Sequence, residues 1–228
     1  PLVVDSYEDP KNTFKTNIFG TINLLEAIRK VKSIKTVIIV TTDKVYKISK
    51  KNPYYDENHP LGATDPYGTS KACKELISES YMYSFFKERN ISITTVRAGN
   101  VIGGGDYSKN RIVPDYLRSL NANKKLILRN PNHVRPWQYV LEPLFGYLSL
   151  AKKETLKKKG GNFQSWNFAP NKSDNVSVRR LIYYFQNSKL NKNKIKIKIL
   201  KNKNKEKETS TLRLNSIKSK KLLRWRNK

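Results

Sequence analysis

The stretch KTVIIV (35–40), followed at once by TTDK (41–44), decides the fold that we predict. Its apolar run is short, rich in β-branched residues and without alternation, which is typical of a strand buried on both faces of a parallel sheet. ISITTVRA (91–98) has the same character. Apolar residues at helical spacing predict helices over 8–31 and 67–89. Strand, helix and strand in this order predict an α/β fold with a doubly wound, Rossmann-type parallel sheet.

The first unit of such a sheet is missing from the chain. The helix at 8–31 has no strand before it, and no G-x-G-x-x-G or related glycine-rich turn occurs in the sequence. Such a turn holds the pyrophosphate of a dinucleotide at a helix N-terminus. We therefore expect the first strand–helix–strand unit to lie upstream of Pro1. After residue 110 the elements become shorter and predict a small mixed α/β lobe.

The chain is strongly basic, and half of its net charge lies at one end. It has 46 Lys and Arg against 18 Asp and Glu, a net charge of +28, and residues 189–228 carry 16 basic and 2 acidic side chains. Such an excess often indicates a polyanionic partner such as nucleic acid. The stretch 189–212 has no aromatic residue that could stack on a base, and asparagine is abundant beside the lysines. Compositional drift toward Lys and Asn is the preferred interpretation, and a nucleic-acid-binding module is the alternative.

Composition also limits the class of protein. The sequence has no run of about 18 apolar residues that would span a membrane. Its one cysteine, Cys73, excludes an intramolecular disulfide framework, and His59 and His133 are too few for a histidine metal site. We expect a protein of the cytoplasm, without a metal ion and without a membrane partner.

Tyr67 and Lys71 form a Y-x-x-x-K motif near the start of the second long helix. The i,i+4 spacing places both side chains on one face of that helix. A lysine ammonium close to a phenol lowers the pKa of the phenol and makes it a better base near neutral pH. The spacing is common by chance in a lysine-rich chain, so an exposed helix pair is the alternative.

Thr41, Thr42, Asp43 and Lys44 follow directly after the strand at 35–40. Open α/β sheets bind their ligands at the carboxyl ends of their strands. A threonine hydroxyl there can donate to a substrate oxygen, and the aspartate and lysine can form an acid–base pair. A polar turn with no chemical role is the alternative.

Five segments extend this pattern into a family resemblance. They resemble the CDP-glucose 4,6-dehydratases, extended short-chain dehydrogenase/reductases with tightly bound NAD, from Pro1 to about Trp225. Lys44 follows the loop aspartate as in those enzymes, where the related dTDP-glucose dehydratases usually have glutamate. The segments are TTDKVY (41–46), DPYGTSK (65–71), RAGNVIGGGD (97–106), RNPNHVRPWQYVLEP (129–143) and WNFAP (166–170).

The resemblance implies a catalytic role for five residues. Tyr67 would take the proton of the sugar C4 hydroxyl as hydride leaves C4 for NAD, and Thr42 would hydrogen-bond that hydroxyl. Lys71 would lower the pKa of Tyr67 and hold the nicotinamide ribose. Asp43 would protonate the departing C6 hydroxyl while Lys44 assists removal of the C5 proton. The hydride would then return to C6, so that NAD is not consumed.

The resemblance also implies residues that bind the cofactor and the substrate. Asn17 and Thr41 would join Tyr67 and Lys71 at NAD, although a structural hydrogen bond is an equal alternative for Asn17. Asn100 would meet the sugar or the diphosphate. Arg111 and Arg135 would make charge-assisted bonds to phosphate oxygens, with a solvated surface charge as the alternative for each. The substrate binding set is therefore Asn100, Arg111 and Arg135.

Domain organisation and partners follow from the same resemblance. Residues 1–110 would form an incomplete NAD-binding Rossmann domain. Residues 111–228 would form a nucleotide-sugar-binding lobe, with some segments returning to the main sheet and a basic stretch at 189–228. A homodimer would form through the helices 8–31 and 67–89.

The function implied is a lyase that converts CDP-glucose to CDP-4-keto-6-deoxyglucose, in a pathway that makes deoxysugars for surface polysaccharide. The resemblance makes the chain an interior fragment, truncated at both ends. A catalytically dead fragment and a dehydratase or epimerase for another nucleotide sugar are the alternatives.

Overall fold

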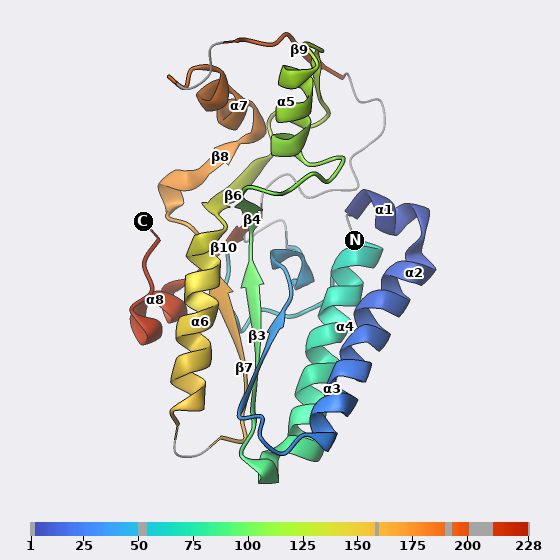
Figure 1. The fold of residues 1–228 in the computed structure, drawn as a ribbon, viewed down its shortest axis with the longest axis vertical. Helices are drawn as coiled ribbons and strands as arrows, with labels where there is room; N and C mark the ends of the chain where they lie inside the picture. The colour runs from blue at the N-terminus through green and yellow to red at the C-terminus, as the bar shows by residue number, and fades with distance from the viewer. Residues whose placement is uncertain (1–2, 50–53, 158–159, 190–192, 201–211, 228) are drawn as a thin grey trace.

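The computed structural model describes residues 3–49, 54–157, 160–189, 193–200 and 212–227. Figure 1 shows a central sheet with helices on both faces and a smaller lobe at one end. The helices are α1 (Val3–Glu8), α2 (Pro10–Phe14), α3 (Gly20–Lys30), α4 (Pro66–Tyr81), α5 (Ile112–Asn121), α6 (Leu141–Thr155), α7 (Val178–Gln186) and α8 (Ile217–Leu223). The strands are β1 (Thr36–Val40), β2 (Tyr54–Tyr55), β3 (Ser92–Ala98), β4 (Asn100–Ile102), β5 (Leu126–Leu128), β6 (Val134–Tyr139), β7 (Phe163–Phe168), β8 (Asn175–Ser177), β9 (Ile197–Ile199) and β10 (Arg213–Leu214).

The central sheet is parallel, with the strand order β1-β3-β7. In its register Val40 lies beside Val96, and Val96 lies beside Trp166. Every residue of β3 except the last is buried, as expected for a strand covered on both faces. The predicted Rossmann-type α/β fold is confirmed.

The first predicted helix is present but divided. It begins at Val3 instead of residue 8 and breaks at Asp9, because Pro10 has no N–H and is favoured at the first position of a new helix. The Asp9 carboxylate caps that helix by accepting from the backbone N–H of Asn12 at 3.0 Å. A π-helical turn, Lys15–Phe19, then joins α2 to α3.

The second predicted helix starts with a strong cap. Pro66 takes the first helical position of α4, and the carboxylate of Asp65 accepts from the N–H of Gly68 at 2.9 Å. This cap fixes the start of the helix one residue before Tyr67. Beyond Tyr81 the chain remains helical through a π turn, Met82–Phe86, and a short 3-10 turn, Lys87–Arg89.

Separate apolar clusters hold the two helical layers to the sheet. One lies between α3, α4 and the strands, and the other lies under α6 and α8. Burying each large apolar side chain stabilises the fold by ~1.5–3 kcal/mol. The first cluster contains Leu25, Ile28, Val37, Ile39, Met82, Phe86, Ile91 and Ile93, and the second contains Val96, Leu150, Trp166, Phe168 and Trp225.

The second half of the chain contributes to both parts of the molecule. β7, α6 and α8 complete the central layers, whereas α5, α7, β5 and β9 form the lobe at the carboxyl ends of the central strands (Figure 1). β7, which lies after residue 110, pairs with β3 in the central sheet. The division of the chain at residue 110 stays a prediction. Of the basic stretch 189–228, residues 190–192, 201–211 and 228 lie outside the described part of the chain. No helix of the described residues is long and apolar enough to cross a membrane.

Candidate active site

The turn after β1 presents a compact set of polar side chains. Thr42 is extended, and its hydroxyl accepts from the N–H of Lys44 at 3.4 Å, which starts the short helical turn Asp43–Val45. The same hydroxyl donates to the Asp43 carboxylate at 3.0 Å. Thr42 and Asp43 are both buried, while Lys44 is half-buried. The strand end therefore holds a hydroxyl, a carboxylate and an ammonium within three consecutive residues.

The start of α4 brings Tyr67 to this turn. Gly68 allows the close approach, because a Cβ at this position would lie 2.6 Å from the carbonyl oxygen of Lys44. A side-chain hydrogen bond joins Tyr67 to Thr42. Two residues that are 25 positions apart in the sequence thus lie side by side at the end of β1.

Lys71 lies one turn further along the same face of α4. Its ammonium is 5.8 Å from the centre of the Tyr67 ring and makes no hydrogen bond or ion pair with another described residue. Burial, with a smaller contribution from Lys74, lowers the pKa of Lys71 from 10.5 to about 8. The lysine is still largely protonated at neutral pH and has free donors.

The pKa of Tyr67 differs from the sequence expectation. Burial raises it, and this effect exceeds the lowering by the Thr42 hydrogen bond and the Arg111 charge. Asp43 raises the pKa further because a second negative charge disfavours phenolate. The expected lowering by Lys71 is not found, since the site is more buried than the motif alone indicates.

Two residues predicted to contact a cofactor have partners inside the protein. The Thr41 hydroxyl donates to Glu75 at 2.6 Å, and both residues are buried. The Asn17 side chain donates to Ser70 at 2.8 Å, and Ser70 in turn donates to the carbonyl of Tyr67 at 2.7 Å. Asn17 therefore supports the backbone of α4 beside Tyr67. Cofactor contacts by Thr41 and Asn17 stay predictions.

The residues predicted to bind substrate lie toward the lobe. Asn100 in β4 pairs with Trp137 in β6, the strand that also carries Arg135. Arg111 is exposed, binds Asp106 at 3.0 Å and is near enough to Tyr67 to lower its pKa. Arg135 is buried, and its guanidinium donates to the Val134 carbonyl and contacts the His133 ring, each at 3.0 Å. Arg135 is thus not a solvated surface charge.

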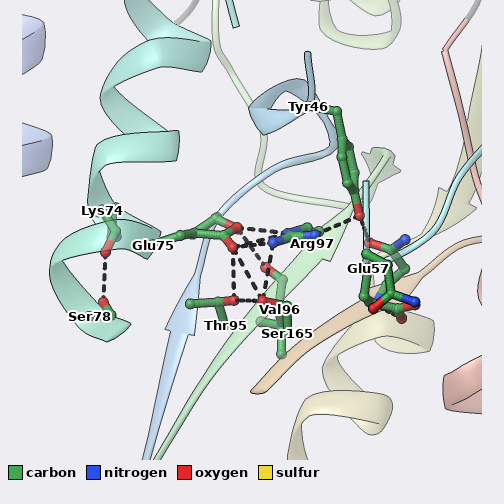
Figure 2. Close-up of polar contacts among 12 residues, drawn as sticks. Tyr46, Glu57, Lys74, Glu75, Ser78, Thr95, Val96, Arg97 and Ser165 are labelled. Atoms are coloured by element: carbon green, nitrogen blue, oxygen red, sulfur yellow. Dashed lines mark hydrogen bonds and ion pairs between the residues drawn. The ribbon is translucent and has the colours of Figure 1, made fainter. Parts of the chain in front are cut away.

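Sequence analysis missed a buried polar network next to the site. Glu75 of α4 forms an ion pair with Arg97 of β3, and Arg97 also donates to the Tyr46 hydroxyl at 2.7 Å (Figure 2). The signals were present, because Glu75 lies four residues after Lys71 and Arg97 stands inside an otherwise buried strand. A buried arginine requires a partner, and an acidic side chain is the usual one.

A cavity of about 340 Å³ borders this ion pair and not the predicted catalytic residues. Its lining is mainly polar and includes Glu57, His59, Glu75, Arg97 and Lys218. Within the described residues no group of acidic, histidine and cysteine side chains could hold a metal ion. The candidate active site is therefore the turn after β1 together with the first two turns of α4.

Comparison with known proteins identifies the family. The family model described as GDP-mannose 4,6 dehydratase matches residues 2–228. The chain belongs to this family. The CDP-glucose 4,6-dehydratase of Salmonella typhimurium is 45% identical over 188 residues, which are 80% of this chain and 52% of that protein. Human dTDP-D-glucose 4,6-dehydratase is 27% identical over 138 residues, 60% of this chain and 37% of that protein. The chain thus spans about half of the first relative and less of the second.

Solved structures of nucleotide-sugar enzymes share the fold. A dTDP-glucose 4,6-dehydratase from Streptomyces venezuelae, solved with NAD and TYD, has a TM-score of 0.79 at 20% identity and covers 100% of this chain and 66% of its own. MoeE5 in complex with UDP-glucose and NAD has a TM-score of 0.82 at 14% identity, covering 98% and 69%. At these identities the likeness establishes the fold alone.

Proposed function

We propose that this chain carries the catalytic residues of an NAD-dependent nucleotide-sugar 4,6-dehydratase that converts CDP-glucose to CDP-4-keto-6-deoxyglucose. The observation that carries the proposal is the convergence of Thr42, Tyr67 and Lys71 at the carboxyl end of β1. The 45% identity to a CDP-glucose 4,6-dehydratase supports the choice of substrate. Lys44, which the sequence resemblance associates with CDP-glucose enzymes, supports it further.

The residues around Tyr67 fit a nicotinamide nucleotide. Lys71 presents a half-buried ammonium with no hydrogen-bond acceptor among the described residues, and a ribose hydroxyl is a suitable acceptor. NAD, when bound, accepts a hydride from the sugar and later returns one. The protein binds and orients both partners so that the sugar C4 hydroxyl lies against Tyr67 and Thr42.

Side chains of this chain carry out the proton transfers of the reaction. Tyr67 takes the proton of the C4 hydroxyl, and its hydrogen bond with Thr42 orients the phenol. For this transfer Tyr67 starts as a phenolate and ends as a neutral phenol. The charge of Arg111 lowers the pKa of Tyr67 and so favours the phenolate, and the Lys71 ammonium lies 5.8 Å from the centre of the ring. The C4 ketone makes the C5 proton acidic. Asp43 then protonates the C6 hydroxyl as it leaves as water, and Lys44 assists removal of the C5 proton.

Residues on the side of the site that faces the lobe bind the diphosphate. Positive charge comes from Arg111, the residue that precedes α5, and from Arg135 on β6, the strand that pairs with β4. A guanidinium forms charge-assisted, often bidentate hydrogen bonds with phosphate oxygens. The buried position of Arg135 makes such a bond stronger than one at the surface.

A homodimer through the helical segments 8–31 and 67–89, which contain α3 and most of α4, is part of the proposal. These helices and the π-helical turns joined to them have exposed apolar side chains, namely Phe19, Leu24, Leu76, Tyr83 and Phe85. Exposed apolar side chains gathered on adjacent helices are typical of a protein interface. The reaction is assigned to the cytoplasm, where Cys73 remains a free thiol.

The test is the reaction itself. The protein is expressed from the complete coding sequence that contains this chain, incubated with CDP-glucose and NAD, and its product is analysed by mass spectrometry and NMR. We expect loss of one water and a 4-keto-6-deoxy sugar, with no net formation of NADH. A C4 epimer of unchanged mass would identify an epimerase, and an unchanged sugar would identify a catalytically dead protein.

A further inference from the structure

One buried ion pair fixes both ends of the turn that holds Thr42, Asp43 and Lys44. At the first end, the Thr41 hydroxyl donates to the Glu75 carboxylate at 2.6 Å. At the other end, Arg97 donates to the Tyr46 hydroxyl at 2.7 Å. The residues immediately around the turn are therefore tied to the same two side chains.

Several hydrogen bonds hold the ion pair in place. The Nε atom of Arg97 lies 2.9 and 3.1 Å from the two carboxylate oxygens of Glu75, and a terminal guanidinium nitrogen also binds this carboxylate. Both side chains are almost fully buried. Thr95 and Ser165 add further hydrogen bonds from β3 and β7 (Figure 2). The pair has few alternative arrangements, because both carboxylate oxygens of Glu75 and all three nitrogens of the Arg97 guanidinium already have partners.

The third connection runs along α4. Glu75 is one turn beyond Lys71 and two turns beyond Tyr67, on the same face of the helix. The carboxylate of Glu75 thus joins the helix that carries Tyr67 and Lys71 to the turn that carries Thr42. No other described ion pair links α4 to β3.

We propose that Glu75 and Arg97 are positioning residues, which set the register between the Tyr67–Lys71 face of α4 and the Thr42–Asp43–Lys44 turn. They do not touch the reacting atoms, and the inference rests on the function proposed above. Proton transfer between the sugar, Tyr67 and Thr42 depends on distances that a shift of about 1 Å would spoil, at a cost of ~10²-fold in rate. A pair of fixed, buried hydrogen-bonding groups holds such distances better than apolar contacts do.

The experiment separates positioning from stability. Glu75→Leu and Arg97→Met are made singly and together, and Glu79→Gln on the next turn of α4 serves as an exposed control that also removes one negative charge. Each single variant leaves a buried charge without its partner and unfolds more easily. The double variant removes both charges, so its melting temperature returns toward that of the wild type. We expect its turnover to remain roughly 10²-fold low, with an unchanged dissociation constant for CDP-glucose.

Hydrogen exchange supplies a measurement that does not depend on activity. In the double variant the amides of residues 41–46 should exchange faster than in the wild type, while those of α7 should not change. Recovery of turnover together with the melting temperature, or unchanged exchange at 41–46, would show that the pair only stabilises the fold. A wild-type protein without dehydratase activity would refute the proposed function, and the exchange result would still decide whether the pair orders the turn.

Discussion

Lys71 holds its ammonium 5.8 Å from the centre of the Tyr67 ring and has no ion-pair partner among the described residues. Burial opposes the charge of this ammonium, which lowers the lysine pKa to about 8, and it also opposes a charged phenolate, which raises the tyrosine pKa. Each group therefore favours its neutral form more strongly than it does in water. Burying these two ionisable groups therefore lowers the stability of the folded protein when either of them is charged.

The first prediction concerns the pH dependence of stability. Because the pKa of Lys71 is about 8 when folded and 10.5 ordinarily, the unfolded chain binds more protons between these values. The contribution of Lys71 to the free energy of unfolding thus rises with pH from about 8 to 10.5 and is most unfavourable below pH 8. Lys71→Met should lack this rise. Denaturant unfolding of both proteins across this pH range gives the difference between their free energies of unfolding. The contributions of the other titrating groups cancel in that difference. Parallel curves for the two proteins would contradict the lowered pKa.

The second prediction concerns Tyr67 as the base. Tyr67→Phe should lower turnover by ~10²–10⁴-fold, because removal of a general base usually costs this much. Binding of CDP-glucose, measured by calorimetry, should change little, since arginines hold the diphosphate. Tyr183→Phe in α7, an exposed tyrosine in the lobe, is the matched control. A Tyr67→Phe protein with more than about a tenth of wild-type turnover would assign the proton transfer to another group.

The helices and strands, and the contacts between residues that are close in sequence, could be predicted because they depend on local patterns. The strands 35–40 and 91–98 and the two long helices follow from apolar spacing, and all four are present. The pairing of Glu75 with Arg97 joins a helix to a strand 22 residues away, which no local pattern records.

The degree of burial of the site residues could not be predicted from the sequence. The i,i+4 spacing correctly brings Lys71 beside Tyr67 but does not reveal how strongly the site is desolvated, so the predicted direction of the Tyr67 pKa was wrong. The break at Asp9 could have been predicted, since proline at the next position is a common helix start.

The third prediction concerns the buried arginine of β6. Arg135→Ala should weaken CDP-glucose binding by ~1.5–3 kcal/mol, the usual value of a hydrogen bond to a charged group. It should also lower stability, because the Arg135 guanidinium donates to the Val134 carbonyl and contacts His133. Arg129→Ala, an exposed arginine six residues earlier, is the control for the loss of one positive charge. Equal affinities for the two variants in calorimetry would leave Arg135 a structural residue.

The fourth prediction concerns the proposed dimer. Leu76 on α4 is 55% exposed, so a charge there should be tolerated by the fold but not by an apolar interface. Leu76→Glu should shift the protein from dimer to monomer in light scattering with little change in melting temperature at low concentration. Leu117→Glu in α5, at 49% exposure, should leave the oligomeric state unchanged. A wild-type protein that is monomeric at all concentrations would contradict the interface.

The last prediction uses the close contact at Gly68. An added Cβ would lie 2.6 Å from both the Lys44 carbonyl oxygen and the Ala63 Cβ, and neither backbone nor a short side chain can move aside alone. Gly68→Ala should therefore push the first turn of α4 away from the turn after β1, with a loss of ~1–3 kcal/mol in stability. Gly20→Ala is the control, because a Cβ at Gly20 meets nothing within 4 Å and alanine favours a helix by ~0.5–1 kcal/mol. Turnover should fall in Gly68→Ala even at temperatures where the protein is fully folded, because the displaced helix carries Tyr67 away from Thr42. Chemical denaturation combined with kinetics checks both effects. A Gly68→Ala protein with normal turnover would show that the contact between α4 and Lys44 does not set the distance between Tyr67 and Thr42.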